Sequence, residues 1–411
     1  MISSSPNRSG LGRTQPRNIL VITYWSFDDA LVQAYTLPYL RLIREVLPQG
    51  STIHLVTLEK RAAPGVREVE PGLLVHAFRY VPFGVRAFGM IADVLWSCLK
   101  LIRGHAIDTI HAWCTPAGML GHILSLLTGR PLIIDSYEPH AEAMVENGTW
   151  SRRGLAFRLL FWSERAQSRR ARVLIAAAEG MKDYAAMKYG MVNGPIHVKP
   201  ACVDLERFSF SDRKDPVLLK ELGLEGKLVG VYAGKFGGIY LDQEVFALIR
   251  MARERWGERF HVLLLTSHTP AELSAYMDRE GLPQEMFTVR FVPHAEVPRY
   301  MGLGDLAITP VRSVPTKRYC TPIKDGEYWA LGLPVIITPD ISDDSRIIAE
   351  RGIGAVLTGL DDEHYKVALT RIDHLLQEHD RRALYDRIRP VAEEFRNYDR
   401  AKAIYQSIYG S

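Results

Sequence analysis

Short apolar runs alternate with longer helical stretches along most of the chain, and this alternation restricts the fold more than any other feature. The runs are rich in Val, Ile and Leu and occupy residues 18–24, 52–58, 108–112, 132–135, 172–176, 228–233, 261–265, 288–292, 306–309, 334–338 and 355–357. Such runs, separated by helices, are typical of strands buried on both faces of a parallel, doubly wound sheet. Ligands bind beyond the carboxyl ends of such strands, so the residues directly after each run are the site candidates.

The length of the chain and a break in the strand pattern predict two domains. A chain of 411 residues exceeds what one hydrophobic core usually fills. The strand pattern stops at the polar, proline-containing residues 199–208 and starts again at Leu228. The N-terminal residues are polar and carry no apolar signal segment. The predicted parts are a flexible tail at 1–17, a first Rossmann-like domain at 18–204, a second at 205–390 and a closing helix at 391–411.

Composition is that of an ordinary globular protein and gives no reason to expect a nucleic-acid partner. Hydrophobic residues make up 47% and charged residues 24%, and 51 basic against 47 acidic side chains leave a net charge of only +4. No apolar run is long enough to span a membrane. The four cysteines, which show no Cys-x-x-Cys pair and no zinc spacing, favour reduced thiols in a cytoplasm; they are Cys98, Cys114, Cys202 and Cys320.

Residues 303–339 have the pattern of a strand, a polar loop, a helix and a second strand, and we predict that this unit holds the functional site. Thr321 followed by Pro322 predicts a helix start at which the threonine hydroxyl caps a free amide. The free N–H groups of this helix would point beyond the sheet edge, where phosphates commonly bind. Lys324 and Glu327 lie three residues apart on one face, so the lysine suits a diphosphate and the glutamate suits ribose hydroxyls. Gly332 should end the helix.

The alternative is that Lys324 and Glu327 form an ordinary surface pair, worth a few tenths of a kcal/mol. A second cation stands in the turn Gly234-Lys235-Phe236-Gly237-Gly238, directly after an apolar run. Glycines let the backbone approach a ligand closely, and a lysine among them suits a diphosphate. A glycine-rich turn alone does not specify a ligand.

Residues 322–335, with the pattern Pro-Ile-Lys-x-x-Glu-Tyr-x-Ala-x-Gly-x-Pro-Val, resemble the donor-binding segment of GT-B glycosyltransferases, most of all glycosyltransferase family four. The resemblance covers about residues 18–409 and implies two Rossmann-like domains facing across a cleft, with the last helix packed back on the first domain. The second acidic residue of the family's Glu-x7-Glu motif falls on Glu327, whereas the first falls on Tyr319. Lys235 matches the cation of the family's Gly-Arg/Lys turn. The donor-binding residues implied are Gly234, Lys235, Gly238, Tyr319, Thr321, Lys324 and Glu327.

A polar loop, residues 135–140, directly follows an apolar run in the first domain. In the resembling family this loop often supplies a His or an acid to the reaction centre, and Tyr137 takes the commonest His position. Glu138 and His140 are therefore the catalytic candidates, able to act as general acid or base or to stabilise a cationic sugar. The alternative roles are a carboxylate at a helix start and a surface histidine. We expect His111 to be structural.

Two basic, aromatic-rich segments, residues 78–103 and 151–172, could form helices that lie on an anionic membrane. The alternative is that these helices dock on the sheet with their arginines in solvent.

The chain is thus predicted to be a cytoplasmic glycosyltransferase, at the inner face of a membrane, that moves a sugar from a nucleotide-diphosphate donor to a glycan or lipid-linked acceptor in cell-envelope or polysaccharide biosynthesis. The resemblance implies retention of anomeric configuration, no cofactor and no metal. Two alternatives are a GT-B-type nucleotide-sugar epimerase, which needs no acceptor, and a non-catalytic nucleotide-sugar-binding partner subunit, suggested by Tyr319 at a glutamate position.

Overall fold

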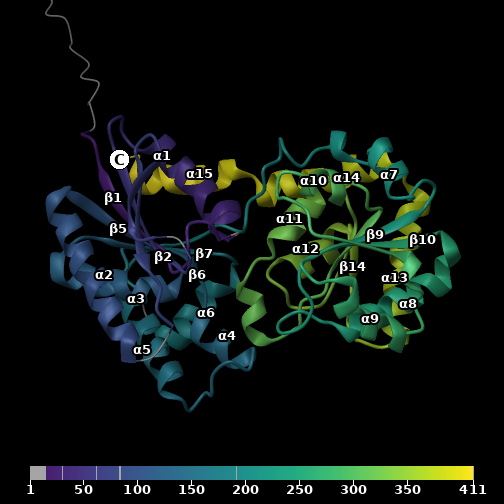
Figure 1. Ribbon diagram of the computed structural model, residues 1–411, viewed down its shortest axis with the longest axis horizontal. Helices are drawn as coiled ribbons and strands as arrows, with labels where there is room; N and C mark the ends of the chain where they lie inside the picture. Colours follow the sequence, from purple (N-terminus) through teal and green to yellow (C-terminus); the bar gives the residue numbers. More distant parts are fainter. Residues whose placement is uncertain (1–14, 30, 62, 83–84, 191, 411) are drawn as a thin grey trace, which may run out of the picture.

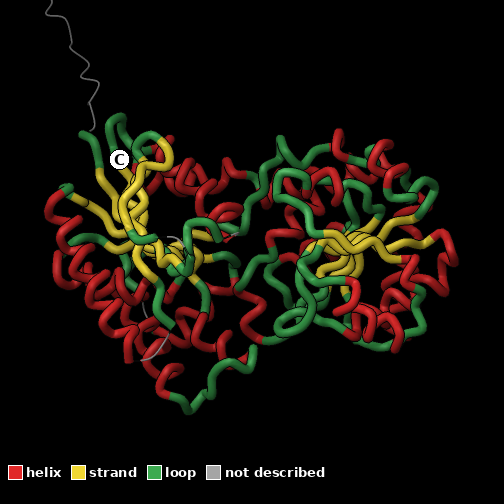
Figure 2. Tube along the Cα trace, in the orientation of Figure 1, coloured by secondary structure: helices red, strands yellow, loops and turns green. Residues whose placement is uncertain are grey.

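The computed structural model describes residues 15–29, 31–61, 63–82, 85–190 and 192–410, which form two α/β domains joined near both ends of the second (Figure 1). In each domain the strands gather in one sheet with helices on both sides (Figure 2). Residues 1–14 of the expected tail lie outside the described part. Arg17, also placed in that tail, donates a hydrogen bond from its backbone to Ser51 Oγ at 2.8 Å, so it belongs to the ordered domain.

The first sheet has eight strands in the order β3-β4-β2-β1-β5-β6-β7-β8, all parallel to their neighbours except β3. Strands β3, β4 and β8 were not predicted. β3 is mostly exposed and charged, and β8 has three residues, so neither shows a buried apolar run. The strands are β1 Asn18–Ile22, β2 Thr52–Glu59, β3 Gly65–Glu70, β4 Leu73–Arg79, β5 Ile107–Trp113, β6 Leu132–Tyr137, β7 Val173–Ala176 and β8 Ile196–Val198.

Helices cover both faces of this sheet and create two separate cores. One core lies under α2, α3 and α6, and the other lies under α1 and the C-terminal α15. The helices of this domain are α1 Leu37–Val46, preceded by the π-turn η1 Val32–Thr36, α2 Val85–Gly104, α3 Thr115–Thr128, α4 His140–Glu146, α5 Leu155–Arg170 and α6 Gly180–Tyr189.

The second sheet is parallel, with its six strands in the order β11-β10-β9-β12-β13-β14. The strands are β9 Leu228–Ala233, β10 Phe260–Leu265, β11 Phe287–Arg290, β12 Leu306–Thr309, β13 Val335–Ile337 and β14 Gly354–Val356. The helices are α7 Pro216–Glu221, α8 Gln243–Trp256, α9 Pro270–Arg279, α10 Val297–Met301, α11 Ile323–Ala330, α12 Asp344–Arg351 and α13 Asp362–Glu378, with short 3-10 turns that include η2 Phe210–Asp212, η3 Gly257–Arg259, η4 Gln284–Met286 and η5 Pro315–Tyr319.

Each sheet reverses its strand order at one place, between β1 and β5 in the first domain and between β9 and β12 in the second. The two strands at such a reversal are followed by helices that pack on opposite faces of the sheet. A crevice therefore opens at the carboxyl ends of these strands. These two crevices are the places where the architecture favours ligand binding.

The C-terminal end consists of two helices, α14 Arg381–Arg396 and α15 Tyr398–Tyr409, where one closing helix was expected at 391–411. The chain breaks at Asn397, whose side chain accepts a hydrogen bond from the Asp399 amide and so starts a new helix. α14 packs against α11 in the second domain, and α15 packs against α1 in the first, where yellow α15 lies beside purple α1 (Figure 1). The C-terminal segment therefore ties the two domains together.

A buried charge cluster holds α15 against the first sheet. Asp135, at the end of β6, accepts a hydrogen bond from the Tyr405 hydroxyl at 2.6 Å, and Lys199 Nζ lies 3.1 Å from its other oxygen. Lys199 Nζ also lies 3.4 Å from the centre of the Tyr39 ring. Burial acts to raise the pKa of Asp135, but the charge of Lys199 and the hydrogen bond with His111 outweigh it and lower the pKa to about 2.

Candidate active site

Helix α11 begins at Ile323, one residue later than predicted, and is not capped as predicted. Pro322 is the N-cap, and no side chain caps the helix. The Thr321 hydroxyl instead donates to the backbone oxygen of Ala177 in the first domain, at 2.6 Å. The predicted cap is wrong because a tertiary acceptor competes for the hydroxyl. Gly332 follows the helix with φ +68°, and a Cβ there would lie 2.5 Å from Tyr385 Cα, so glycine is required at this position.

The amine of Lys324 lies at the reversal point of the second sheet. Its Nζ is 5.1 Å from the centre of the Tyr232 ring and 4.7 Å from that of Tyr240. A Cβ on Gly234 would come within 2.3 Å of Nζ, so the amine rests against the backbone of the turn after β9. Burial lowers the pKa of Lys324 to about 8, although the charges of Asp325 and Glu327 act to raise it. The lysine is therefore not the exposed member of a surface pair.

Lys235 directly follows Gly234 and is exposed, so both predicted cations belong to the same end of the second sheet. The Tyr232 hydroxyl donates to the backbone oxygen of Lys235 and holds the start of the turn in place. Gly237 and Gly238 have φ values of +80° and +67°, a left-handed conformation that favours glycine. The turn thus presents backbone and one lysine beside the amine of Lys324.

The carboxylate of Glu327 lines a cavity of about 370 Å³ between the two domains. Arg207 and His294 from the second domain and Gln33 and Arg41 from the first also line it. Burial raises the pKa of Glu327 to about 7, while the charges of Lys324 and Arg207 act to lower it. Arg207 donates to the His294 ring and backbone oxygen, which fixes the far wall of the cavity. Nothing in the local sequence around Arg207 or His294 indicated this position.

Of the two catalytic candidates, Glu138 contacts the second domain and His140 lies beside Glu138. His140 Nδ1 lies 3.8 Å from Glu138 Oε1, and the Cys320 thiol donates to Glu138 Oε2 at 3.1 Å. Burial acts to raise the pKa of Glu138, but His140, Cys320 and the charge of Lys317 together lower it. The carboxylate is therefore held ionised between two elements that are far apart in sequence.

Glu164 on α5 supports this loop and was not singled out in the sequence. It accepts hydrogen bonds from the Ala141 amide at 2.9 Å and the Tyr189 hydroxyl at 2.9 Å, directly behind His140. Burial raises the pKa of Glu164 to about 7 against these hydrogen bonds. A single glutamate on an arginine-rich helix gives no local signal of such a position.

Three further residues of the sequence analysis have packing contacts. The Tyr319 ring packs on Tyr184 of the first domain at 4.9 Å between centres, so it forms part of the contact between domains. Tyr137 is buried, and its hydroxyl bonds to Ser168 at 2.7 Å. His111 is fully buried, with Nδ1 2.7 Å from the Tyr409 hydroxyl, which confirms its predicted structural role.

Among the described residues, no cluster of three or more His, Cys, Asp or Glu side chains is arranged to hold a metal ion.

Comparisons with known proteins indicate the class of enzyme. Residues 38–202 match the glycosyl transferase 4-like domain family. α-D-Kanosaminyltransferase from Streptomyces kanamyceticus is 20% identical over 294 residues, which cover 66% of this chain and 74% of that protein. The chain is a GT-B glycosyltransferase.

Solved structures show the same fold over nearly the whole glycosyltransferase. Sucrose-phosphate synthase from Thermosynechococcus elongatus superposes with a TM-score of 0.75 at 15% identity, covering 96% of this chain and 98% of that one. HepE from Anabaena, in complex with UDP and glucose, superposes with a TM-score of 0.70 at 14% identity, covering 96% and 100%. The predicted fold and the predicted transferase class are thus confirmed, and the family match favours transfer over the epimerase and partner-subunit alternatives.

Proposed function

We propose that this glycosyltransferase binds a nucleoside-diphosphate sugar at the end of the second sheet and transfers the sugar to an acceptor held by the first domain. The observation that carries the proposal is the amine of Lys324 against Gly234, one residue from Lys235. In this arrangement both lysines bind the diphosphate, Gly234 and Gly238 let it approach the backbone, and Glu327 accepts hydrogen bonds from the ribose. Tyr319 and Thr321 position the loop before α11 through their contacts with the first domain.

The proposed chemistry depends on charge that develops on the leaving diphosphate. As the glycosidic bond breaks, negative charge grows on the phosphate oxygen, and two preset cations with the N-terminus of α11 stabilise it more than they stabilise the ground state. Because lysines supply this countercharge, we propose metal-independent transfer. We also propose retention of anomeric configuration, which rests on the resemblance of residues 322–335 to the donor-binding segment of family four. Glu138 and His140 stand where they could bind the acceptor hydroxyl or stabilise a cationic sugar. NMR of the product anomer tests retention.

The nucleotide site is tested by titrating UDP, a ligand of the similar structure of HepE, into the protein and variants. Glu327→Ala should weaken binding by roughly 1.5–3 kcal/mol, because a hydrogen-bonded charged group is lost. Lys235→Ala should weaken UDP binding more than uridine binding. Unchanged UDP affinity in Glu327→Ala would remove Glu327 from the site, and equal losses for UDP and uridine would remove Lys235 from the diphosphate. Loss of UDP binding in EDTA would contradict metal independence.

UDP affinity should also fall at alkaline pH. Lys324 is protonated below its pKa of about 8, so the full attraction for the diphosphate is present there. Above this pH the free protein has lost the proton that the complex needs, and affinity should fall by up to about tenfold per pH unit. Calorimetric titration of UDP from pH 7 to 9.5 measures this fall in affinity. In Lys324→Met the decline should be absent; a decline that persists there would assign it to another group.

We further propose that the acceptor is a glycan or a lipid-linked glycan of envelope or polysaccharide synthesis, and that the enzyme acts in the cytoplasm at an anionic membrane. Among the described residues, no helix has the length and apolar character needed to cross a bilayer. Large apolar side chains are nevertheless exposed on three neighbouring helices of the first domain: Phe88 and Trp96 on α2, Leu126 and Leu127 on α3, and Leu155, Leu159 and Trp162 on α5. We call this set the apolar helix surface. Exposed arginines accompany it, among them Arg86, Arg103, Arg158 and Arg165.

Vesicle sedimentation tests this membrane contact. The protein should bind vesicles that contain phosphatidylglycerol at low salt and should leave them at high salt, because surface charges are screened. Phe88→Ser with Trp162→Ser should weaken binding several-fold, since two apolar side chains no longer enter the interface. Val367→Ser, an equally exposed apolar position on α13 of the second domain, is the matched control. Equal binding to neutral and anionic vesicles would contradict the proposal.

A further inference from the structure

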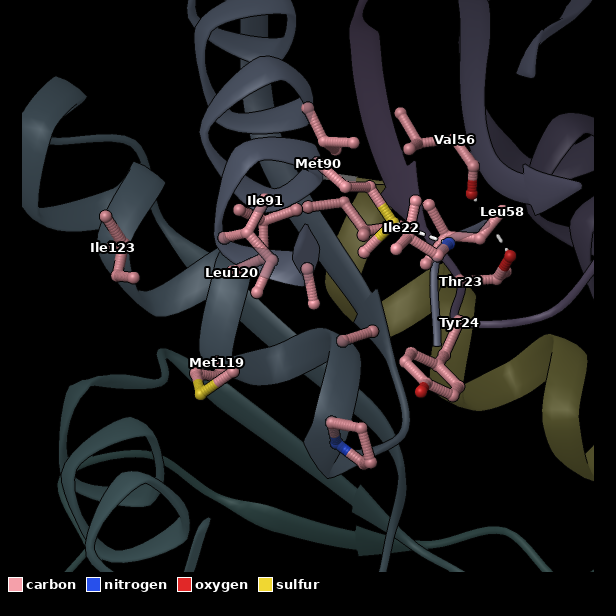
Figure 3. A pocket seen from close by; sticks show the side chains of 15 residues that line it. Ile22, Thr23, Tyr24, Val56, Leu58, Met90, Ile91, Met119, Leu120 and Ile123 are labelled. Atoms are coloured by element: carbon pink, nitrogen blue, oxygen red, sulfur yellow. Dashed lines mark hydrogen bonds between the residues drawn. The ribbon is translucent and has the colours of Figure 1, made fainter. Parts of the chain in front are cut away.

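A pocket of about 140 Å³ opens in the first domain between α2 and α3 (Figure 3). Its floor is formed by the ends of β1 and β2 and by the residues just after them, such as Ile22, Thr23 and Leu58. Met90 and Ile91 approach from α2, and Leu120 approaches from α3 (Figure 3). The pocket therefore lies at the carboxyl end of β1, beside the place where the first sheet reverses its strand order.

Among the residues that the structure describes, few polar groups line the pocket and could bind a sugar hydroxyl. Its walls are aliphatic side chains, alanine, proline and two methionines, with Thr23 and Tyr24 as the polar members. The Thr23 hydroxyl already donates to the Val56 backbone oxygen at 3.1 Å, and the Val81 amide points at Met90 Sδ at 3.2 Å. Because a sugar placed here would lose its hydrogen bonds to water without replacement, the pocket selects an apolar group.

The pocket adjoins the catalytic candidates. Thr115 Oγ1 lies 3.5 Å from the backbone oxygen of Glu138 and 3.3 Å from Glu164 Oε1. Pro116, the next residue, lines the pocket. The pocket and the loop of the catalytic candidates therefore share the N-terminus of α3, which places both at the carboxyl end of the first sheet.

We propose that this pocket binds the first carbons of the hydrocarbon chain of a lipid-linked acceptor. The inference rests on the proposed transferase function and narrows its acceptor to a molecule with an apolar chain. An apolar cavity of about 150 Å³ accepts benzene, so there is room for about six carbons. The same helices, α2 and α3, carry Phe88, Trp96, Leu126 and Leu127 of the apolar helix surface. Phe88 stands within one helical turn of the pocket residues Met90 and Ile91, and this exposed apolar side chain favours a hydrocarbon chain that extends toward a bilayer over a compact rigid group.

The test uses primary n-alcohols from propanol to nonanol as probes in calorimetric titrations. Each added methylene should tighten binding about fourfold, the equivalent of about 0.8 kcal/mol, until about six carbons fill the pocket, and the affinity should then level off. The branched isoprenoid alcohol citronellol should bind as well as hexanol or better. If 4-methylbenzyl alcohol binds and the alkyl and isoprenoid alcohols do not, the pocket holds a rigid aromatic group and the lipid assignment is wrong.

Variants connect this binding to the pocket. Leu120→Gln places an amide in the wall, and Ile91→Trp fills the space, so each should weaken hexanol binding at least tenfold. Ala92→Gln, on the exposed side of α2, is the matched control and should bind hexanol as the parent does. Two pocket variants are used so that the experiment still gives a result if one of them does not fold. Binding that is independent of chain length, or equal in both folded pocket variants and the control, would overturn the proposal.

UDP titration of the same proteins separates this inference from the proposed function. UDP should bind the pocket variants as tightly as it binds the parent, because the nucleotide site lies in the other domain. If UDP binds and the alcohols do not, only the pocket assignment fails. If the alcohols bind as expected and neither UDP nor another nucleoside diphosphate binds, the proposed donor site fails while the apolar pocket stands.

Discussion

Replacing Lys324 with methionine is expected to weaken UDP binding by about tenfold to a hundredfold, the equivalent of roughly 1.5–3 kcal/mol. Methionine keeps an apolar stem between the Tyr232 and Tyr240 rings, so the loss reports the missing charge. Gly234→Ala should act in the same direction, because its Cβ would lie 2.3 Å from the amine and would displace it. The two substitutions lie in different elements and should converge on one effect.

Calorimetric titration of UDP and uridine measures this effect, and Lys366→Met, an exposed lysine on α13, is the matched control. The loss should be larger for UDP than for uridine, since the amine contacts the diphosphate. A folded Lys324→Met protein with the UDP affinity of the parent would contradict the proposed donor site. In that case the buried amine would serve only the packing of α11 on the turn after β9.

Asp135→Asn is expected to lower the free energy of unfolding of the first domain by about 3–5 kcal/mol. The amide keeps the shape of the carboxylate but leaves the charge of Lys199 buried without a partner, since both side chains are fully buried in the structure. Adding Lys199→Met removes that charge, so the double variant should recover part of the loss. Urea unfolding followed by tryptophan fluorescence measures both proteins.

Glu179→Gln is the matched control for this experiment, because Glu179 pairs with Lys182 at 2.6 Å on the surface. Exposed pairs of this kind contribute about 0–1 kcal/mol. If Asp135→Asn destabilises no more than this control, the cluster does not hold α15 on the first sheet. If the double variant is as unstable as the single one, the loss comes from the hydrogen bonds of Asp135 and not from the unpaired lysine.

Residue spacing was sufficient to predict two α/β domains and to locate helix α11, where the donor site is proposed. Buried parallel strands are apolar along their length, so most of them could be located from composition within short windows. Lys324 and Glu327 could be placed on one helix because three-residue spacing has a fixed geometry. The edge strand β3 escaped prediction because it is exposed and charged, and therefore lacks the apolar run that marks the central strands.

Other parts of the site could not be predicted because competing contacts come from the other domain. A local rule assigns the Thr321 hydroxyl to the start of α11, but the Ala177 oxygen accepts its hydrogen bond instead. Tyr319 stands at a position of the donor motif, yet its ring packs on Tyr184. Local propensities describe a segment in isolation, and a partner that folding brings within 3 Å can outweigh them.

The sequence by itself determined the alternation of strands and helices, the glycine turn with its lysine and the face of α11, because each follows from the geometry of a few consecutive residues. Only the tertiary structure decided that the Cys320 thiol bonds to Glu138, 182 residues away, and that Lys199 pairs with Asp135 under α15. Such contacts form where separate elements pack, and the pairing offsets the free energy that it costs to remove these charges and polar groups from water. The spacing of residues within one segment cannot predict which side chains become buried against another segment.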